Sequence, residues 1–313
     1  MLNIEQSEFH STQLISLDEY FDDMIKLYDS KLFPKVFLLN GKKGIGKFTL
    51  VFHFLNYIYS KEEKIPYNTR DKKINLDSKF YNSLLNQNCT DVIFFRAPQG
   101  KNIKIDDVRK LKSILTHTSL SDNPRFTIID EVEFLNTNSA NALLKTLEEP
   151  TENNYFILIN NQQEILLETI SSRCLKNNIF LTIKQKKNII DYLVEKNKII
   201  LSINDIDNLT PGLLFKYNEL LNKYKIIMNE NILSKLNKLL NFYKKDKDKD
   251  IINMSIFFID KFFFEKVLKN KNKIDPLLTL KSLIVNKIND FTIYNLNVNS
   301  VLNSIEFQLK NVR

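Results

Sequence analysis

Several residue types are scarce in this 313-residue sequence, and each scarcity excludes a class of protein. Only two cysteines occur, Cys89 and Cys174, which excludes a disulfide framework and a four-cysteine zinc site. No apolar run approaches the roughly 20 residues that a membrane-spanning helix needs. The first residues lack the basic and apolar regions of a signal peptide. The sequence therefore predicts a cytoplasmic protein without membrane association and without zinc.

Arginine is also scarce, although the net charge is +8. Of the 45 basic residues the arginines are Arg70, Arg96, Arg109, Arg125, Arg173 and Arg313. A positive net charge permits contact with nucleic acid. The lysines are scattered along the chain, however, and a solvated lysine-rich surface explains the charge at least as well. A directly DNA-binding module therefore stays one alternative for the function.

Glycine occurs only five times, and three of the five fall within six positions. These are Gly41, Gly44 and Gly46, and Lys47 follows them. Together they match the frame G-x-x-x-x-G-K, in which backbone N–H groups and a lysine hold phosphate oxygens. An apolar run at 36–39 predicts a buried strand before the loop, and the apolar stretch after it predicts a helix. The sequence therefore predicts a phosphate-binding loop, and a glycine-rich turn without a ligand is the alternative.

One position of this loop departs from the motif. Phe48 stands where a serine or threonine would supply a hydroxyl ligand to Mg²⁺. Thr49 follows it and is only a poor substitute as a ligand. We therefore expect a site for the phosphates of ATP or ADP that is badly suited to magnesium, and the sequence leaves open whether nucleotide is bound.

A second chemical signal is the pair Asp130-Glu131, which ends the apolar run 126–129. In phosphate-loop enzymes the acidic residue at the end of such a strand holds Mg²⁺. A neighbouring glutamate can polarise the attacking water as a general base. A strand that runs into the acidic first turn of a helix is the alternative explanation.

The pattern of apolar residues divides the chain into a mixed part and a helical part. Strand-like runs alternate with helical patterns in the first part, for example at 92–95, 126–129 and 155–159. This alternation predicts an α/β fold with a parallel sheet covered on both faces. The remaining chain is helical in pattern, so the fold class is α/β followed by all-α. We place the domains at 1–179, 180–225 and 226–313.

Four motifs, in order along the chain, resemble those of one protein family. They are the approach to the loop at 32–41, I-x-I-D-x-V-R-x-L at 103–111, N-A-L-L-K-x-L-E-E-P at 141–150, and Ser172-Arg173-Cys174. In sequence and spacing they resemble the motifs of clamp-loader subunits of the AAA+ class. The resemblance covers about residues 20 to 180 closely.

This resemblance implies an AAA+ nucleotide-binding domain at 1–179, a helical lid at 180–225 and a helical collar at 226–313 that joins subunits into a ring. It implies that Arg173 is an arginine finger, a guanidinium that reaches the γ-phosphate of ATP held by a neighbouring subunit. The implied partners are the motor gamma/tau subunits, the delta subunit, the sliding clamp and primed DNA.

The chain departs from the ATP-hydrolysing members of the family at three points. Phe48 replaces the metal-binding hydroxyl, the stretch 60–91 holds only Cys89 where motor subunits carry a zinc module, and no arginine lies between 174 and 312 to sense ATP. These departures resemble the delta-prime class, which commonly has a degenerate loop but keeps its finger, and they imply no or weak intrinsic ATPase activity. A gamma/tau-like subunit that binds and hydrolyses ATP is the alternative, because Asp130-Glu131 is complete.

Overall fold

The computed structural model describes residues 11–96, 102–116, 123–269 and 274–310. Residues 1–10, from which we expected no signal peptide, lie outside this range. The chain divides into two compact units, Met1–Ile199 with Asp205–Leu213, and Ile200–Asn204 with Leu214–Arg313. The division into three domains at 180 and 226 stays a prediction.

The first unit is built on a five-stranded parallel sheet. Its strands are β1 (Val36–Asn40), β2 (Val92–Arg96), β3 (Arg125–Asp130), β4 (Asn154–Asn160) and β5 (Leu175–Asn178). They lie in the order β2-β3-β4-β1-β5, and every neighbouring pair is parallel. Every residue of β1 and β3 is buried, as expected for strands covered on both faces. The predicted α/β fold with a parallel sheet is confirmed.

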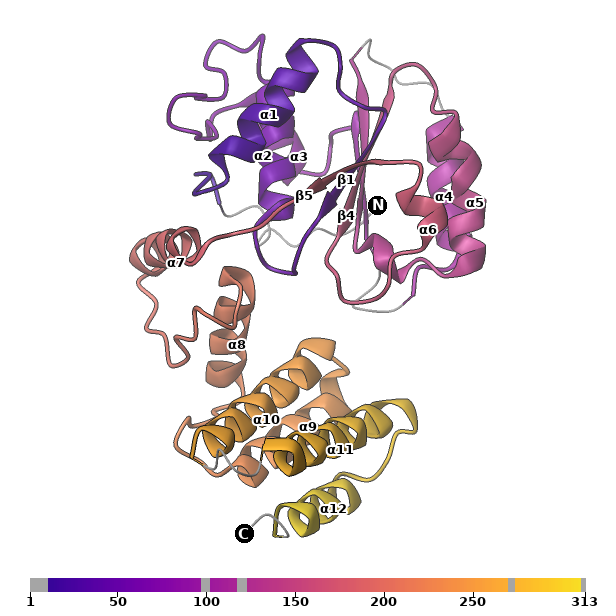
Figure 1. Cartoon of the computed structure of the whole chain (residues 1–313). Helices are drawn as coiled ribbons and strands as arrows, with labels where there is room; N and C mark the ends of the chain where they lie inside the picture. Colours follow the sequence, from indigo (N-terminus) through magenta and orange to yellow (C-terminus); the bar gives the residue numbers. More distant parts are fainter. Residues whose placement is uncertain (1–10, 97–101, 117–122, 270–273, 311–313) are drawn as a thin grey trace. The chain divides into compact units, whose positions relative to one another are not determined.

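Helices cover both faces of the sheet, as Figure 1 shows. On one face lie α1 (Asp18–Asp29), α2 (Lys47–Tyr59) and α3 (Lys79–Leu85), and on the other lie α4 (Ile105–Thr116), α5 (Thr137–Glu148) and α6 (Glu168–Ser171). A short 3-10 helix, η3 (Val132–Phe134), follows β3, and α7 (Ile183–Asn197) follows β5. Each face has its own apolar core; Phe21 and Phe54 belong to the first, and Leu111 and Leu143 to the second.

Polar side chains determine where several helices begin. The Asn136 side chain accepts a hydrogen bond from the N–H of Ser139 and so caps α5. Thr182 and Gln185 cap α7 reciprocally, because each side chain binds the other residue's backbone N–H. These caps satisfy N–H groups that have no partner inside a helix.

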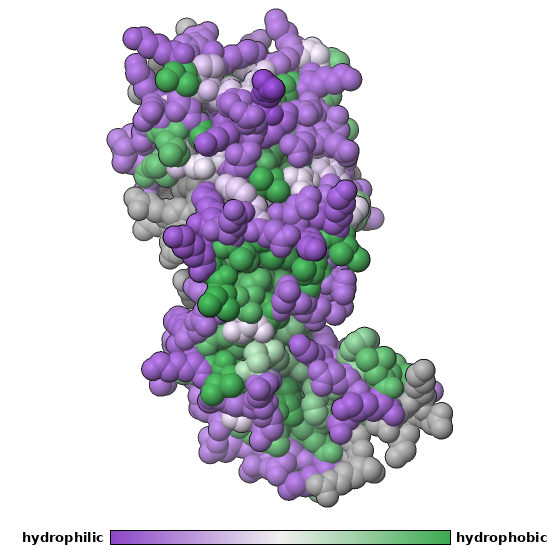
Figure 2. Space-filling view, turned by 90° about the vertical axis from the view of Figure 1, so that its left-hand side faces the viewer, coloured by the Kyte–Doolittle hydropathy of each residue, from purple (hydrophilic) through white to green (hydrophobic). Residues whose placement is uncertain are grey.

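The second unit is helical. It contains α9 (Ile232–Asp246), α10 (Lys249–Lys269), α11 (Ile274–Ile293) and α12 (Val298–Lys310), together with the greater part of α8 (Pro211–Lys223). Buried side chains such as Leu236, Phe263 and Ile288 form its core. Large hydrophobic side chains also remain exposed on these helices, among them Phe264 and Phe307. Figure 2 shows hydrophobic areas interrupting the hydrophilic surface of one face.

The helical second unit completes the predicted fold class, an α/β domain followed by helices. In the part of the chain that the structure describes, no helix combines the length and the apolar character needed to cross a membrane.

Candidate functional site

A polar residue ends each of the five strands. These residues are Arg96 on β2, Asp130 on β3, Asn160 on β4, Asn40 on β1 and Asn178 on β5. They are register partners between neighbouring strands, Arg96 with Asp130 and Asn40 with both Asn160 and Asn178. Parallel sheets bind ligands beyond the carboxyl ends of their strands. The row of polar residues therefore marks this edge as the candidate site.

The three asparagines form a chain of amide hydrogen bonds. The Asn160 amide nitrogen donates to the Asn40 oxygen at 2.8 Å, and the Asn40 nitrogen donates to the Asn178 oxygen at 2.7 Å. Asn40 and Asn160 are both buried. These bonds satisfy buried amides and fix β4, β1 and β5 relative to one another directly before the loop begins.

The loop after β1 has the geometry that its motif predicts. It runs from Gly41 to Gly46, and α2 begins at Lys47. Gly44 and Gly46 have φ angles of +80° and +96°, which glycine adopts without strain. Thr49 lies in the first turn of α2, half-buried, and its hydroxyl makes no hydrogen bond to a described residue.

Lys47 is buried at the start of α2. Its ammonium donates to the carbonyl oxygens of Gly41 at 2.6 Å and Lys42 at 2.8 Å. Burial lowers the pKa of Lys47 to about 8, against the charges of Asp130 and Glu133, which raise it. Lys47 therefore stays mostly protonated at neutral pH. An ammonium has three donors, so one remains beyond these two bonds.

The segment Thr210–Gly212 packs directly on this loop. The Thr210 hydroxyl donates to the Lys43 carbonyl at 2.6 Å, and the Gly212 N–H donates to the Gly44 carbonyl at 2.8 Å. A Cβ atom on Gly212 would lie 2.7 Å from the Gly44 Cα, so this contact requires glycine. The sequence predicted this segment as part of the lid but did not predict its contact with the loop.

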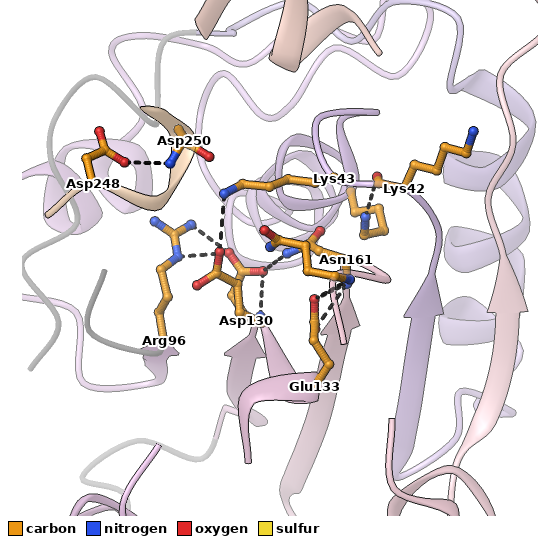
Figure 3. Close-up of polar contacts among 11 residues, drawn as sticks. Lys42, Lys43, Arg96, Asp130, Glu133, Asn161, Asp248 and Asp250 are labelled. Atoms are coloured by element: carbon orange, nitrogen blue, oxygen red, sulfur yellow. Dashed lines mark hydrogen bonds and ion pairs between the residues drawn. The ribbon is translucent and has the colours of Figure 1, made fainter. Parts of the chain in front are cut away.

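Asp130 uses both oxygens of its carboxylate within the chain (Figure 3). One oxygen accepts from Arg96 Nε at 2.9 Å and from Arg96 Nη2 at 2.6 Å. The other accepts from the Glu131 N–H at 2.9 Å and from the Asn161 amide at 3.1 Å. A carboxylate offers about four lone-pair sites. All four are used, so Asp130 has none left for a metal ion.

Phe48 lies against the same arginine. The Arg96 guanidinium carbon is 5.4 Å from the centre of the Phe48 ring, a cation–π distance, and the Phe94 ring centre is 5.6 Å from that of Phe48. Phe48, which stands where the motif has a metal-binding hydroxyl, thus contacts the positively charged side chain of Arg96 instead. The donor set at this edge does not fit Mg²⁺, because the hydroxyl is missing and the carboxylate is saturated.

The two glutamates near Asp130 are also engaged. Glu131, with a left-handed φ of 58°, has a carboxylate oxygen 3.7 Å from the Lys43 ammonium. Glu133 accepts hydrogen bonds from the backbone N–H groups of Asn161 and Gln163. Burial raises the pKa of both carboxyl groups, and the Lys43 charge opposes the rise at Glu131. A glutamate paired with a loop lysine is poorly disposed to act as a general base.

Sequence reasoning missed three residues of this site: Arg96, Glu133 and Asn161. Two of them carried a signal, because Arg96 and Asn161 are polar residues at or just after the end of an apolar strand. The loop, Asp130 and Glu131 were expected to lie together, and the Lys43–Glu131 pair joins them.

Arg173 lies in a different place. It follows α6, and its guanidinium Nε and Nη2 donate to one Glu148 carboxylate oxygen at 2.6 and 2.5 Å. Its Nη1 donates to the Thr169 carbonyl at 2.9 Å and to the Ser172 hydroxyl at 3.2 Å. These contacts lie on α5 and α6, on the face of the sheet opposite α2 (Figure 1). Its side chain is 32% exposed, so the guanidinium is held at the surface.

Several known proteins that are similar to this chain are subunits of DNA polymerase III. A delta-prime subunit of DNA polymerase III from Buchnera aphidicola subsp. Baizongia pistaciae is 29% identical over 140 residues, 41% of each chain. The delta-prime subunit of Pseudomonas aeruginosa is 40% identical over 76 residues, 24% of this chain and 23% of the relative. The tau subunit of Bacillus subtilis is 31% identical over 144 residues, 46% of this chain and 24% of the relative. The matched segments span less than half the length of these relatives.

Among solved structures, a gamma-subunit-related protein of DNA polymerase III from Thermotoga maritima is similar in fold. The alignment covers 95% of this chain and 99% of that protein, with 18% sequence identity and a TM-score of 0.48. The family model described as "DNA polymerase III, delta subunit" matches residues 17–182, more than half of the chain. The relatives named delta-prime, gamma and tau agree with the resemblance that the motifs indicated. The chain therefore belongs to the DNA polymerase III delta-subunit family of clamp-loader proteins.

Proposed function

We propose that this chain is a delta-prime-like subunit that completes a clamp-loader ring and supplies Arg173 in trans to the ATP of the adjacent subunit. One observation carries the proposal. Arg173 is fixed at the surface by Glu148 of α5 and by the α6 backbone, and these two helices lie on the face of the sheet opposite α2. An arginine held beside α5 and α6, away from the α2 helix that follows this chain's own loop, is suited to a ligand outside its own domain.

The chemistry of guanidinium suits this role. A planar guanidinium stabilises the charge on a phosphoryl group in transfer, and its donors match phosphate oxygens in pairs. In the proposed complex, phosphate oxygens of the neighbour's ATP replace the Glu148 carboxylate, while the Thr169 carbonyl keeps the guanidinium oriented. Before assembly, Glu148 keeps the Arg173 guanidinium in this orientation.

In this proposal the chain itself has no or weak ATPase activity. Asp130 is saturated by hydrogen bonds, and Glu131 is paired with Lys43. ATP turnover then takes place in the motor gamma/tau subunits and loads the sliding clamp on primed DNA in the cytoplasm. The delta subunit and the motor subunits are the proposed direct partners.

The test is Arg173→Ala in the reconstituted loader. An arginine finger contributes about 10³- to 10⁵-fold to turnover at the site that it serves. We therefore expect a large loss of DNA-stimulated ATPase activity while the variant still assembles into the ring. Arg70→Ala, which removes an exposed arginine of the same unit, is the matched control and leaves the rate unchanged. A normal rate with Arg173→Ala would refute the finger.

The second candidate is a gamma/tau-like ATPase, favoured by the relatives of those names and by the complete Asp130-Glu131 pair. It predicts magnesium-dependent ATP hydrolysis by the purified chain that Lys47→Ala abolishes. A directly DNA-binding module instead predicts binding of the isolated chain to DNA that weakens steeply with salt.

A further inference from the structure

We propose that Arg96 takes the place of the divalent cation at the phosphate loop, so that the loop holds the phosphate groups of a nucleotide without magnesium. This inference goes beyond the proposed function, because it concerns the chain's own loop and does not depend on Arg173. The fixed guanidinium, the donors left on the loop and the charge balance around it support the proposal.

The guanidinium is fixed by the sheet. Arg96 and Asp130 are the last residues of adjacent strands and are register partners, so their backbones stand side by side. Two hydrogen bonds to one Asp130 oxygen and the Phe48 ring then hold the guanidinium from two sides. These contacts hold the charge of Arg96 in one place beside Asp130 and the first turn of α2. A bound metal ion, in contrast, needs open carboxylate oxygens and near-octahedral geometry.

The loop keeps donors for an anion. No described residue accepts a hydrogen bond from the backbone N–H of Gly44, Ile45 or Gly46. The buried Lys47 ammonium has a third donor beyond its two carbonyl partners. Backbone N–H groups at the start of a helix, with a buried lysine beside them, are suited to phosphate oxygens.

The charges around the loop favour an anion as well. Lys42, Lys43, Lys47 and Arg96 bring four positive charges, and Asp130, Glu131 and Glu133 bring three negative charges. Burial also raises the pKa of both glutamates, which favours their neutral forms. The excess is one positive charge and comes from protein side chains alone, so it offsets part of the charge of a phosphate ligand without a metal ion. The ligand class is a nucleoside di- or triphosphate.

The experiment titrates the full chain with ADP and with inorganic pyrophosphate, in EDTA and in MgCl₂. We expect binding in EDTA that magnesium does not tighten, because Asp130 has no free lone pair for the metal. A tightening of about tenfold or more with magnesium would overturn the proposal. Failure to bind either probe in either buffer would overturn it too.

Two variants test the arginine itself. Arg96→Gln removes the charge and should weaken binding in EDTA by at least about tenfold, since a unit charge several ångströms away is worth that much in a partly buried site. Arg109→Gln, which removes an exposed arginine also paired with an aspartate, is the matched control and binds normally. If the glutamine variant fails to fold, Arg96→Lys tests the charge from the other side, because it keeps the positive charge and should still bind both probes in EDTA. Binding by Arg96→Gln as tight as that of the wild type would exclude the cation role.

The double variant Phe48→Thr with Arg96→Ser tests the opposite change. It supplies the hydroxyl and frees the Asp130 oxygen that Arg96 occupies. We expect weak binding in EDTA and at least about tenfold tighter binding in magnesium. Metal-independent binding by this variant would contradict the proposal. Arg173→Ala should leave every titration unchanged, which keeps this test separate from that of the finger.

Discussion

The buried histidine of α2 gives a prediction with a calculable magnitude. His53 is fully buried between Tyr67 and the segment that precedes α1. Its Nε2 lies 2.8 Å from the Ser11 carbonyl oxygen, which only accepts, so Nε2 carries the proton. Its Nδ1 then accepts from the Tyr67 hydroxyl at 2.8 Å. Both ring nitrogens are satisfied in the neutral form.

Burial lowers the pKa of His53 from 6.5 to about 4, against a smaller opposing effect of the Ser11 carbonyl. Between these values the unfolded chain binds a proton that the folded chain does not, so stability falls as the pH falls. The contribution is complete above pH 6.5 and is lost progressively down to about pH 4. At about 1.4 kcal/mol per pKa unit, the loss amounts to about 3 kcal/mol.

The assay is urea unfolding of the wild type and of His53→Gln at several pH values between 7.5 and 4.5. The carboxylates titrate in both proteins, so the difference between them isolates the histidine. The wild type should lose stability more steeply below pH 6.5, by about 1.4 kcal/mol per pH unit. Parallel curves for the two proteins would refute the assignment of a neutral, buried His53.

Two further predictions concern the loop and the strands that support it. Gly212→Ala places a methyl group 2.7 Å from the Gly44 Cα and should destabilise the first unit by about 1–3 kcal/mol. The measurement is a lower unfolding midpoint. An unchanged midpoint would mean that the phosphate-binding loop and the segment Thr210–Gly212 can separate without loss of stability. Asn40→Ala removes the middle of the amide chain and leaves the Asn160 and Asn178 amides without that partner, at a cost of about 1–3 kcal/mol. Urea unfolding measures it, and a loss below about 0.5 kcal/mol would show that water replaces the Asn40 amide.

The sequence predicted the parts of the site that are local. Three clustered glycines and Lys47, between an apolar run and a helical pattern, identify the loop because each feature lies within a few residues of the next. Asp130-Glu131 was predictable for the same reason. The order α/β followed by helices also follows from local periodicity.

The remaining contacts depend on tertiary structure. Arg96 meets Asp130 only because β2 lies next to β3, an order that no local pattern specifies. Thr210 reaches the Lys43 carbonyl across 167 residues of sequence. The pairing of Arg173 with Glu148 likewise needs α5 and α6 to be neighbours. Phe48 could therefore be recognised from the sequence as a missing ligand, but not as the support of another cation.

The saturated carboxylate of Asp130 also constrains how this loop can evolve. A substitution that returned a hydroxyl at Phe48 would meet oxygens already bound by Arg96, so it would gain neither metal nor hydrolysis. Loss of Arg96 alone would leave the buried Asp130 carboxylate without its cation and would remove the cation–π contact of Phe48. Either substitution alone, at Phe48 or at Arg96, loses a stabilising contact and restores no metal binding. A return to metal binding at this loop thus requires at least two coordinated substitutions, at Phe48 and at Arg96, which makes such a return improbable by single steps.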